Sequence, residues 1–263
     1  DEHGKINGQN PAFADGFTND ALYKDKDGKV CYPLGTYLIQ EVKAPEGYLV
    51  NDEILEVTIT EDGTDNLHVK TYNEKIKGDD TIIRGGVKLA KIDNDLDEAY
   101  AQGDASLKGA EFTIYNQSAE TVMVKGKEIG KGDAALVITT NADGIATSGD
   151  HDLPYGSYLV KETKPSKGYL LNTEWSRAFR IREEGVIIDL TEDKVREAVI
   201  RGGVQIIKRD KELVKSEALG GAHLDGIVMT IKNVSGRDVV VRKDLDNKTD
   251  KVDWKKLESK AEL

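Results

Sequence analysis

Hydrophobic and polar residues alternate along most of the chain in short runs. The stretches VKLAKID (87–93) and GSYLVKE (156–162) are examples, and Gly, Asn and Asp bound such runs. Alternation with a period of two is typical of β-strands with one buried face, and the Asp-Gly pair at 143–144 indicates a turn between two of them. Helical spacing is absent except near residues 254–263. The pattern predicts an all-β chain folded as antiparallel sandwiches.

The sequence contains an internal repeat. Residues 32–51 and 153–172 align without a gap at an offset of 121 and are identical at ten of twenty positions. Residues 81–93 match residues 198–210 at an offset of 117. The repeating unit is therefore about 117–121 residues long, an ordinary size for one domain.

The order of the parts divides the chain into three repeats. A complete unit has a lysine strand, a Gly-Ala step with its strand, a strand with a Glu-Gly-Tyr signature, and a closing strand. Residues 84–200 contain all four parts, residues 1–83 lack the first, and residues 201–263 lack the last two. We therefore expect one complete repeat between two truncated ones, as an interior piece of a longer array.

Two charged residues continue apolar stripes. Lys91 shares a strand face with Val87 and Leu89, and Glu162 continues the stripe of Tyr158. These stripes face the core, where either charge alone is costly to bury. A lysine and a glutamate in repeated copies on core stripes indicate a shared buried site.

These elements resemble a known family. The lysine strand VKLAKID, the step LKGAEFTIYN and the stretch GSYLVKETKPSKGY are similar to the B-type repeat domain of the Gram-positive collagen adhesin, which also occurs in SpaA-type pilins. Residues 35–48, GTYLIQEVKAPEGY, match the family pattern G-x-Y-x-x-x-E-x-x-x-P-x-G-Y more fully. The resemblance implies tandem Greek-key sandwiches of the prealbumin-like or inverse immunoglobulin-like kind.

In many members of that family a lysine on the first strand forms an isopeptide bond with Asn or Asp on the last, assisted by a buried glutamate. A desolvated lysine loses its proton and becomes nucleophilic, whereas a desolvated glutamate keeps its proton and can polarise the acceptor. The core holds the groups in attack geometry. The product links the first and last strands covalently.

For the central repeat the resemblance assigns Lys91 as the nucleophile and Glu162 as the assisting acid. Alignment of the closing strands places Glu192 at the acceptor position, which departs from the Asn or Asp of the family. Asp193 is the neighbouring candidate, although it points to the other face unless a bulge shifts the register. The alternative is that Lys91 and Glu162 form only a buried salt bridge.

The flanking repeats carry parts of the same set. In residues 1–83 the resemblance assigns Glu41 as the assisting acid and Asn73 as the acceptor. In residues 201–263 it assigns Lys208 as the nucleophile.

Composition narrows the classes of function. The net charge of −11 disfavours nucleic acid and anionic membranes as partners, and no apolar run is long enough to insert into a membrane. The single cysteine excludes an internal disulfide. The four histidines lack metal-ligand spacing, and we expect the aspartates of residues 93–97 to form a solvated acidic loop instead of a calcium site. We therefore predict no metal and no cofactor.

The leading hypothesis is a structural stalk or pilin-like repeat of an extracellular, cell-wall-attached protein whose signal peptide and anchor lie outside this segment. Its partners would be neighbouring repeats of the same chain. The alternative is an adhesin module that binds a host matrix protein or glycan directly, since one fold serves both roles. We expect no enzyme beyond a single-turnover self-cross-link, because no nucleophile–base–orienter set is visible in the sequence.

Overall fold

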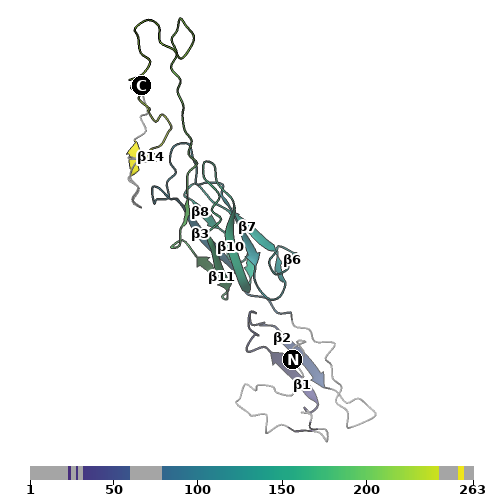
Figure 1. Ribbon diagram of the computed structural model, residues 1–263. Helices are drawn as coiled ribbons and strands as arrows, with labels where there is room; N and C mark the ends of the chain where they lie inside the picture. The colour runs from purple at the N-terminus through teal and green to yellow at the C-terminus, as the bar shows by residue number, and fades with distance from the viewer. Residues whose placement is uncertain (1–22, 25–27, 29–31, 60–78, 243–253, 258–263) are drawn as a thin grey trace. The chain divides into compact units, whose positions relative to one another are not determined.

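The structure is a computed structural model, and it describes residues 23–24, 28, 32–59, 79–242 and 254–257. Contacts divide the chain into two compact units, Asp1–Ile82 and Ile83–Leu263. The described residues form strands, turns and loops without an α-helix, which confirms the all-β prediction (Figure 1).

The central repeat is a sandwich of two sheets (Figure 1). The first sheet is antiparallel, in the order β11 (Ser176–Ile181), β10 (Gly156–Lys164), β4 (Glu111–Asn116) and β7 (Ala134–Thr139). The second is built around the long strand β3 (Arg84–Asp93), which pairs with β8 (Ile145–Thr147), β9 (Leu153–Pro154), β12 (Ile187–Asp189) and β13 (Val195–Glu197). A small hairpin joins β5 (Val122–Val124) to β6 (Lys127–Ile129).

The first and last strands of this repeat run parallel. β12 and β13 both pair with β3 in parallel, and the register aligns Val195 with Lys91 and Glu197 with Asp93. The first sheet is antiparallel as expected, and the second is mixed, since β3 pairs in antiparallel with β8 and β9 and in parallel with β12 and β13. The crossover through the whole sandwich is long enough to return the chain in the parallel sense.

The core lies between the two sheets. The stripes predicted from alternation are buried, with Val87, Leu89 and Tyr158 fully inaccessible to solvent. Phe112 packs edge-on against Trp175 with ring centroids 5.8 Å apart, a favourable aromatic geometry. The described part of the chain has other buried residues in the same cluster, including Ile114, Val160, Phe179, Ile181 and Val195.

The first unit repeats local features of the central one. It contains the antiparallel pair β1 (Gly35–Gln40) and β2 (Ile54–Ile59). The hydroxyl of Tyr37 donates to the carbonyl of Pro33 at 2.7 Å, and in the central repeat the Tyr158 hydroxyl donates to Pro154 O at the same distance. The offset of 121 found in the sequence is therefore an offset between equivalent structural positions.

The segment after the central repeat is mostly exposed. Residues 201–234 contain no strand, and β14 (Val239–Arg242) pairs with β15 (Trp254–Leu257). The hint of a helix near residues 254–263 is thus wrong for residues 254–257. Val204 and Ile206, which share a strand face with Lys208 in the repeat alignment, are also exposed.

Candidate functional site

The amine of Lys91 lies at the centre of a charged cluster inside the sandwich, and its side chain is fully buried. Nζ donates hydrogen bonds to Glu197 and, at 2.5 Å, to Ser166 Oγ. Glu162 Oε1 is 3.9 Å from the same nitrogen, and the face of the Tyr169 ring covers it at 4.5 Å from the centroid. Strands β3, β10 and β13, distant in sequence, therefore converge on one amine.

Both carboxyl groups are as deeply buried as the amine. Glu162 Oε2 accepts a hydrogen bond from the backbone N–H of Asn172 at 2.7 Å. The Oε1 atoms of Glu162 and Glu197 are the buried side-chain atoms of the described residues that have no hydrogen-bond partner. Such atoms are costly, and a proton shared between the two carboxyls would give each Oε1 atom a partner.

The environment favours that shared proton. Burial raises the pKa of Glu197 to about 8, and the hydrogen bond and negative charge of Glu162 act in the same direction, while Lys91 opposes them. A cluster of one ammonium, one carboxylate and one carboxylic acid is neutral overall. Moving the ammonium proton to the carboxylate gives a free amine that faces two carboxylic acids.

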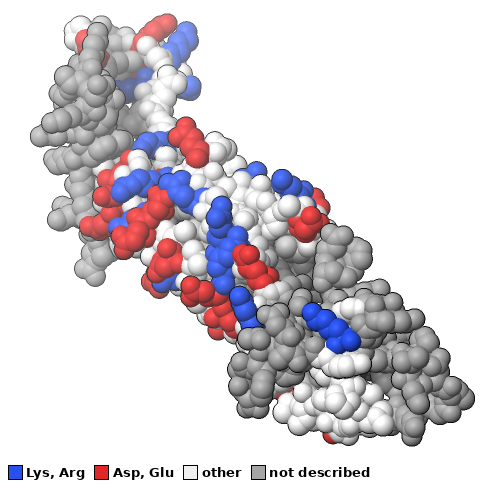
Figure 2. Space-filling view, turned by 90° about the horizontal axis from the view of Figure 1, so that it is seen from below, with Lys and Arg blue, Asp and Glu red and all other residues white. Residues whose placement is uncertain are grey.

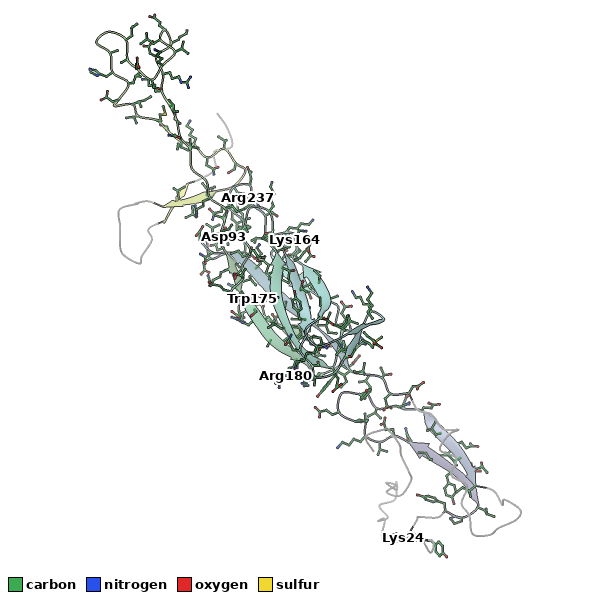
Figure 3. The ribbon with its side chains drawn as sticks, turned by 45° about the vertical axis from the view of Figure 1, so that its right-hand side comes forward. Lys24, Asp93, Lys164, Trp175, Arg180 and Arg237 are labelled. Carbon is green, nitrogen blue, oxygen red and sulfur yellow. The ribbon has the colours of Figure 1, made fainter. Side chains whose placement is uncertain are left out.

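A second buried acid holds the tyrosine ring that covers the Lys91 amine. Asp93, two residues after Lys91 on β3, is fully buried and accepts hydrogen bonds from Tyr169 OH at 2.8 Å, Gln102 Nε2 at 3.0 Å and Asp95 N at 2.9 Å. Burial and the bond to Asp93 raise the pKa of Tyr169, so its hydroxyl stays a donor. The expectation of a solvated loop is therefore wrong for Asp93, which is labelled in Figure 3 and fixes the tyrosine over the amine.

The glycine of the Glu-Gly-Tyr signature has a steric reason. Gly168 has a φ of +86°, and a Cβ added there would lie 2.7 Å from Ala105 Cβ. Only glycine fits both constraints, and the close approach seats Tyr169 over the site. Gly47 of the first unit has a similar φ of +91°.

The structure separates Lys91 from the two acceptor candidates that the sequence alignment suggested. Glu192 is exposed, and the carboxylate of Asp193 pairs with Arg177 at the surface. The structure places neither beside Lys91. Glu197 occupies that position, because it ends β13 on a buried face and its side chain reaches back to the amine.

The same contacts show which residue of the first unit corresponds to Glu197. Asn172 Nδ2 donates to the carbonyl of residue 196, and Asn51 Nδ2 donates to the carbonyl of residue 79, so the residues that follow these carbonyls are equivalent. Asp80 therefore corresponds to Glu197. The sequence itself indicates this correspondence, because Asp80 and Glu197 each stand four residues before an Arg-Gly-Gly triplet.

Of the other predicted site residues, the structure describes Glu41 and Lys208. Glu41 is half-buried, and its Oε2 accepts from Asn51 N at 2.7 Å, the contact that Glu162 makes with Asn172. Asn73 lies outside the described residues. Lys208 is exposed. The structure thus places Lys91 and Glu162 of the central repeat in one buried cluster, with Glu197 as its third member.

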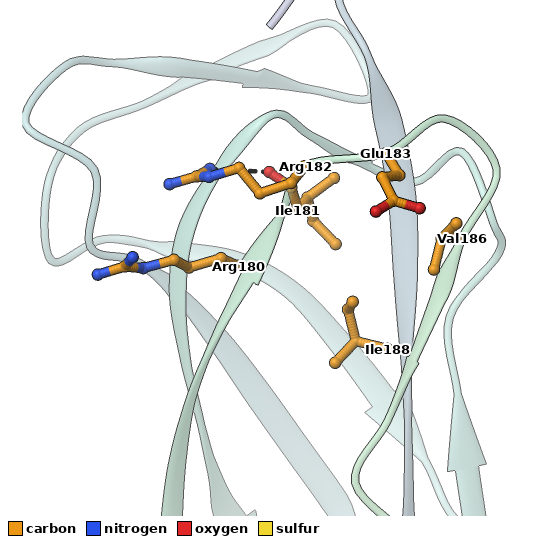
Figure 4. Close-up of a pocket in the computed structure, with 6 residues that line it drawn as sticks. All are labelled: Arg180, Ile181, Arg182, Glu183, Val186 and Ile188. Atoms are coloured by element: carbon orange, nitrogen blue, oxygen red, sulfur yellow. Dashed lines mark hydrogen bonds between the residues drawn. The ribbon is translucent and has the colours of Figure 1, made fainter.

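The described residues line shallow hollows. One of about 90 Å³ beside β11 and β12 is lined by Arg180, Ile181, Arg182, Glu183, Val186 and Ile188 (Figure 4). Another, of about 150 Å³, lies in the first unit and is lined by Leu49, Val50, Asn51, Asp52, Asp79 and Thr81. Arg182 uses its guanidinium to donate to the Ile181 carbonyl at 2.8 Å.

The described residues contain no group of three or more His, Cys, Asp or Glu side chains that could hold a metal. A helix long and apolar enough to cross a bilayer is also absent from them.

Comparison with known proteins gives a family. The model of the SpaA prealbumin-like fold domain matches residues 5–75 and 85–194, more than half of the chain. No curated protein matches.

Among solved structures, the chain is similar to the Bacillus anthracis TIE protein, with 28% identity over 67% of this chain and 28% of that one, at a TM-score of 0.41. It is also similar to the major pilin SpaD of Corynebacterium diphtheriae, with 18% identity over 44% and 30% of the two chains and a TM-score of 0.29. The shaft pilin SpaA of Lactobacillus rhamnosus GG, in its D295N mutant, shows 17% identity over 70% and 75% and a TM-score of 0.32. The chain spans less than a third of the first two proteins.

The match to the family agrees with the sandwich, with the repeated Glu-Gly-Tyr signature and with the buried lysine between two acids. This chain belongs to the SpaA family of prealbumin-like fold domains.

Proposed function

We propose that the chain is a load-bearing stalk segment of an extracellular, wall-attached protein, in which Lys91 and Glu197 of the central repeat become joined by an amide bond. The observation that carries the proposal is the fully buried Lys91 amine in contact with the Glu197 carboxyl, with Glu162 at 3.9 Å. Several proteins to which the chain is similar are pilins, including the major pilin subunit of Bacillus cereus.

The reaction is a condensation. The neutral Lys91 amine attacks the carbonyl carbon of protonated Glu197, and the C–N bond forms as the C–OH bond breaks and water leaves. Glu162 donates a hydrogen bond to the acceptor oxygen and moves protons from nitrogen to the leaving hydroxyl. Holding amine and acid together in a dry core supplies an effective concentration on the order of 10⁵ M or more, which drives amide formation despite surrounding water.

The position of the bond suits a stalk. Because β3 and β13 lie side by side in parallel, tension along the chain shears these two strands. A bond between Lys91 and Glu197 carries that load and bypasses the intervening sandwich. Figure 2 shows acidic and basic side chains interspersed over the face in view, and the net charge of −11 opposes aggregation.

Single-molecule stretching of the full chain tests the role. Lys91 and Glu197 are 106 residues apart, so an unlinked repeat lengthens by roughly 350–380 Å when it unfolds, at 3.3–3.6 Å per residue. The native protein should show no such step, whereas Lys91→Met should show it. A step of that size in the native protein contradicts the proposal.

A binding screen against matrix proteins and glycans tests the adhesin alternative. Saturable binding by the native chain, abolished by substitutions on the sandwich surface, would replace the stalk role by a binding role.

A further inference from the structure

One buried polar residue near the cross-link site bonds in two directions. Gln102 is 3% exposed, and its Nε2 donates to the carboxylate of Asp93. Its Oε1 accepts a hydrogen bond at 3.0 Å from the backbone N–H of Val240, on β14. Val240 is itself only 4% exposed. The side-chain amide of Gln102 therefore connects Asp93 of the central repeat to Val240, which follows Gln102 by 138 positions.

An arginine of the following segment holds the same loop. Arg237 Nε donates to Gly103 O at 2.9 Å, and its Nη2 donates to Ala105 O. In return Gly103 N donates to Asp238 O at 3.0 Å. Figure 3 labels Arg237 and Asp93 at the same end of the sandwich. A guanidinium that satisfies two carbonyls of one loop fixes both position and orientation.

A second arginine, Arg201, bonds both to the central repeat and to the segment that follows it. Arg201 Nη2 lies 2.5 Å from Asp95 Oδ2 of the central repeat, and its Nη1 donates at 2.9 Å to Val240 O. The pair is partly sheltered, since the Asp95 side chain is 10% exposed. The contact therefore combines a charge pair with backbone hydrogen bonds on both segments.

The docked segment is a repeated structural element. Asn233 Nδ2 donates to the carbonyl of residue 237 at 2.8 Å, and at an offset of 117 Asn116 Nδ2 donates to the carbonyl of residue 120 at 3.1 Å. In the central repeat Arg84 Nη2 donates to Met123 O at 3.1 Å, as Arg201 does to Val240 O. Each segment thus carries the same asparagine-anchored turn, clamped by the arginine of its own Arg-Gly-Gly triplet.

We propose that residues 101–105 of one repeat form a docking surface for the asparagine-anchored turn of the next repeat, here residues 233–241. This surface gives the stalk a defined junction and places the neighbour directly over the aspartate and tyrosine that cover the Lys91 cluster. The proposal rests on the stalk function and names its immediate partner, the following repeat of the same chain. It does not require the amide bond between Lys91 and Glu197.

Amide hydrogen exchange of the full chain tests the junction. In the native protein, exchange at Gly103 and Val240 should be at least roughly tenfold slower than in an open chain, because both N–H groups are bonded across the contact. Arg237→Ala should accelerate exchange on both sides, in residues 101–105 and in residues 235–242. Arg209→Ala, an exposed arginine of the same segment, is the matched control and should change neither side.

The exchange of β4 and β10 reports whether the central repeat stays folded in each variant. Open-chain exchange at Val240 and Gly103 in the native protein overturns the proposal, as does an effect of Arg237→Ala restricted to its own segment. Intact mass and the binding screen test the amide bond and the stalk role separately, so failure of either is distinguishable from failure of the junction.

Discussion

Replacing Lys91 by methionine removes the amine from the core while keeping a side chain of similar length. If the native central repeat contains the Lys91–Glu197 amide, its mass is about 18 Da below the value calculated from the sequence, since one water leaves per bond. Lys91→Met should have its full calculated mass. Glu162→Gln should also keep its full mass, because an amide cannot relay the protons of the condensation.

The stabilisation follows from the loop that the bond closes. Lys91 and Glu197 are separated by 106 residues, and cross-linking a loop of about 100 residues restricts the unfolded chain by about 4.7 kcal/mol. With an unfolding entropy of about 2.1 cal/mol/K per residue, a repeat of this size should lose roughly 20 °C in Tm on Lys91→Met. The two carboxyls left without a cation add to the loss.

Intact-protein mass spectrometry and a tryptic digest provide the assay. Trypsin does not cleave at an acylated lysine, so the native digest should contain residues 89–108 joined to residues 197–201. Thermal unfolding followed by circular dichroism then compares the native chain with both variants.

Lys88→Met is the matched control, since Lys88 lies on the same strand with its side chain 38% exposed and pairs with Asp189 at the surface. It should keep the mass deficit and lose little in Tm. A native protein at its full calculated mass, with no branched peptide, refutes the condensation. The site would then be a buried ionic cluster.

Three further outcomes are expected. In Lys91→Met, burial and Glu162 still raise the pKa of Glu197, so the folded state holds a proton that the unfolded state releases. The free energy of unfolding should therefore fall as pH rises above 4.5, which urea midpoints at pH 5, 7 and 9 check. The double variant with Glu197→Gln should show a flatter dependence of stability on pH. Gly168→Ala should destabilise the central repeat by roughly 1–3 kcal/mol, because the φ of residue 168 is positive and the new Cβ has no room. Gly202→Ala should be near neutral in the same denaturation assay, because no atom lies within 4 Å of its new Cβ. Tyr169→Phe should cost about 1–3 kcal/mol in urea unfolding by depriving a buried carboxylate of a donor, yet retain the 18 Da deficit; loss of the deficit would show that the hydroxyl takes part in the condensation.

The sequence alone determined the strand class, the repeat and two members of the buried site. A period of two places Lys91 and Glu162 on core faces whatever the fold, because alternate side chains of a strand point the same way. The 121-residue offset likewise reappears as matching hydrogen bonds of Glu41 and Glu162. Strand alternation and repeat similarity can both be recognised in the sequence without the tertiary structure.

Only the tertiary structure identified Glu197, and it also buried Asp93 where the sequence suggested a solvated loop. The closing strand is three residues long and pairs in parallel with β3, so its register depends on how the whole sandwich returns to the first strand. Alternation within so short a strand does not fix that register. Asp93 is likewise buried by Gln102, across the loop that follows it, and by Tyr169, 76 residues later, and the second contact is set by tertiary packing instead of by local pattern.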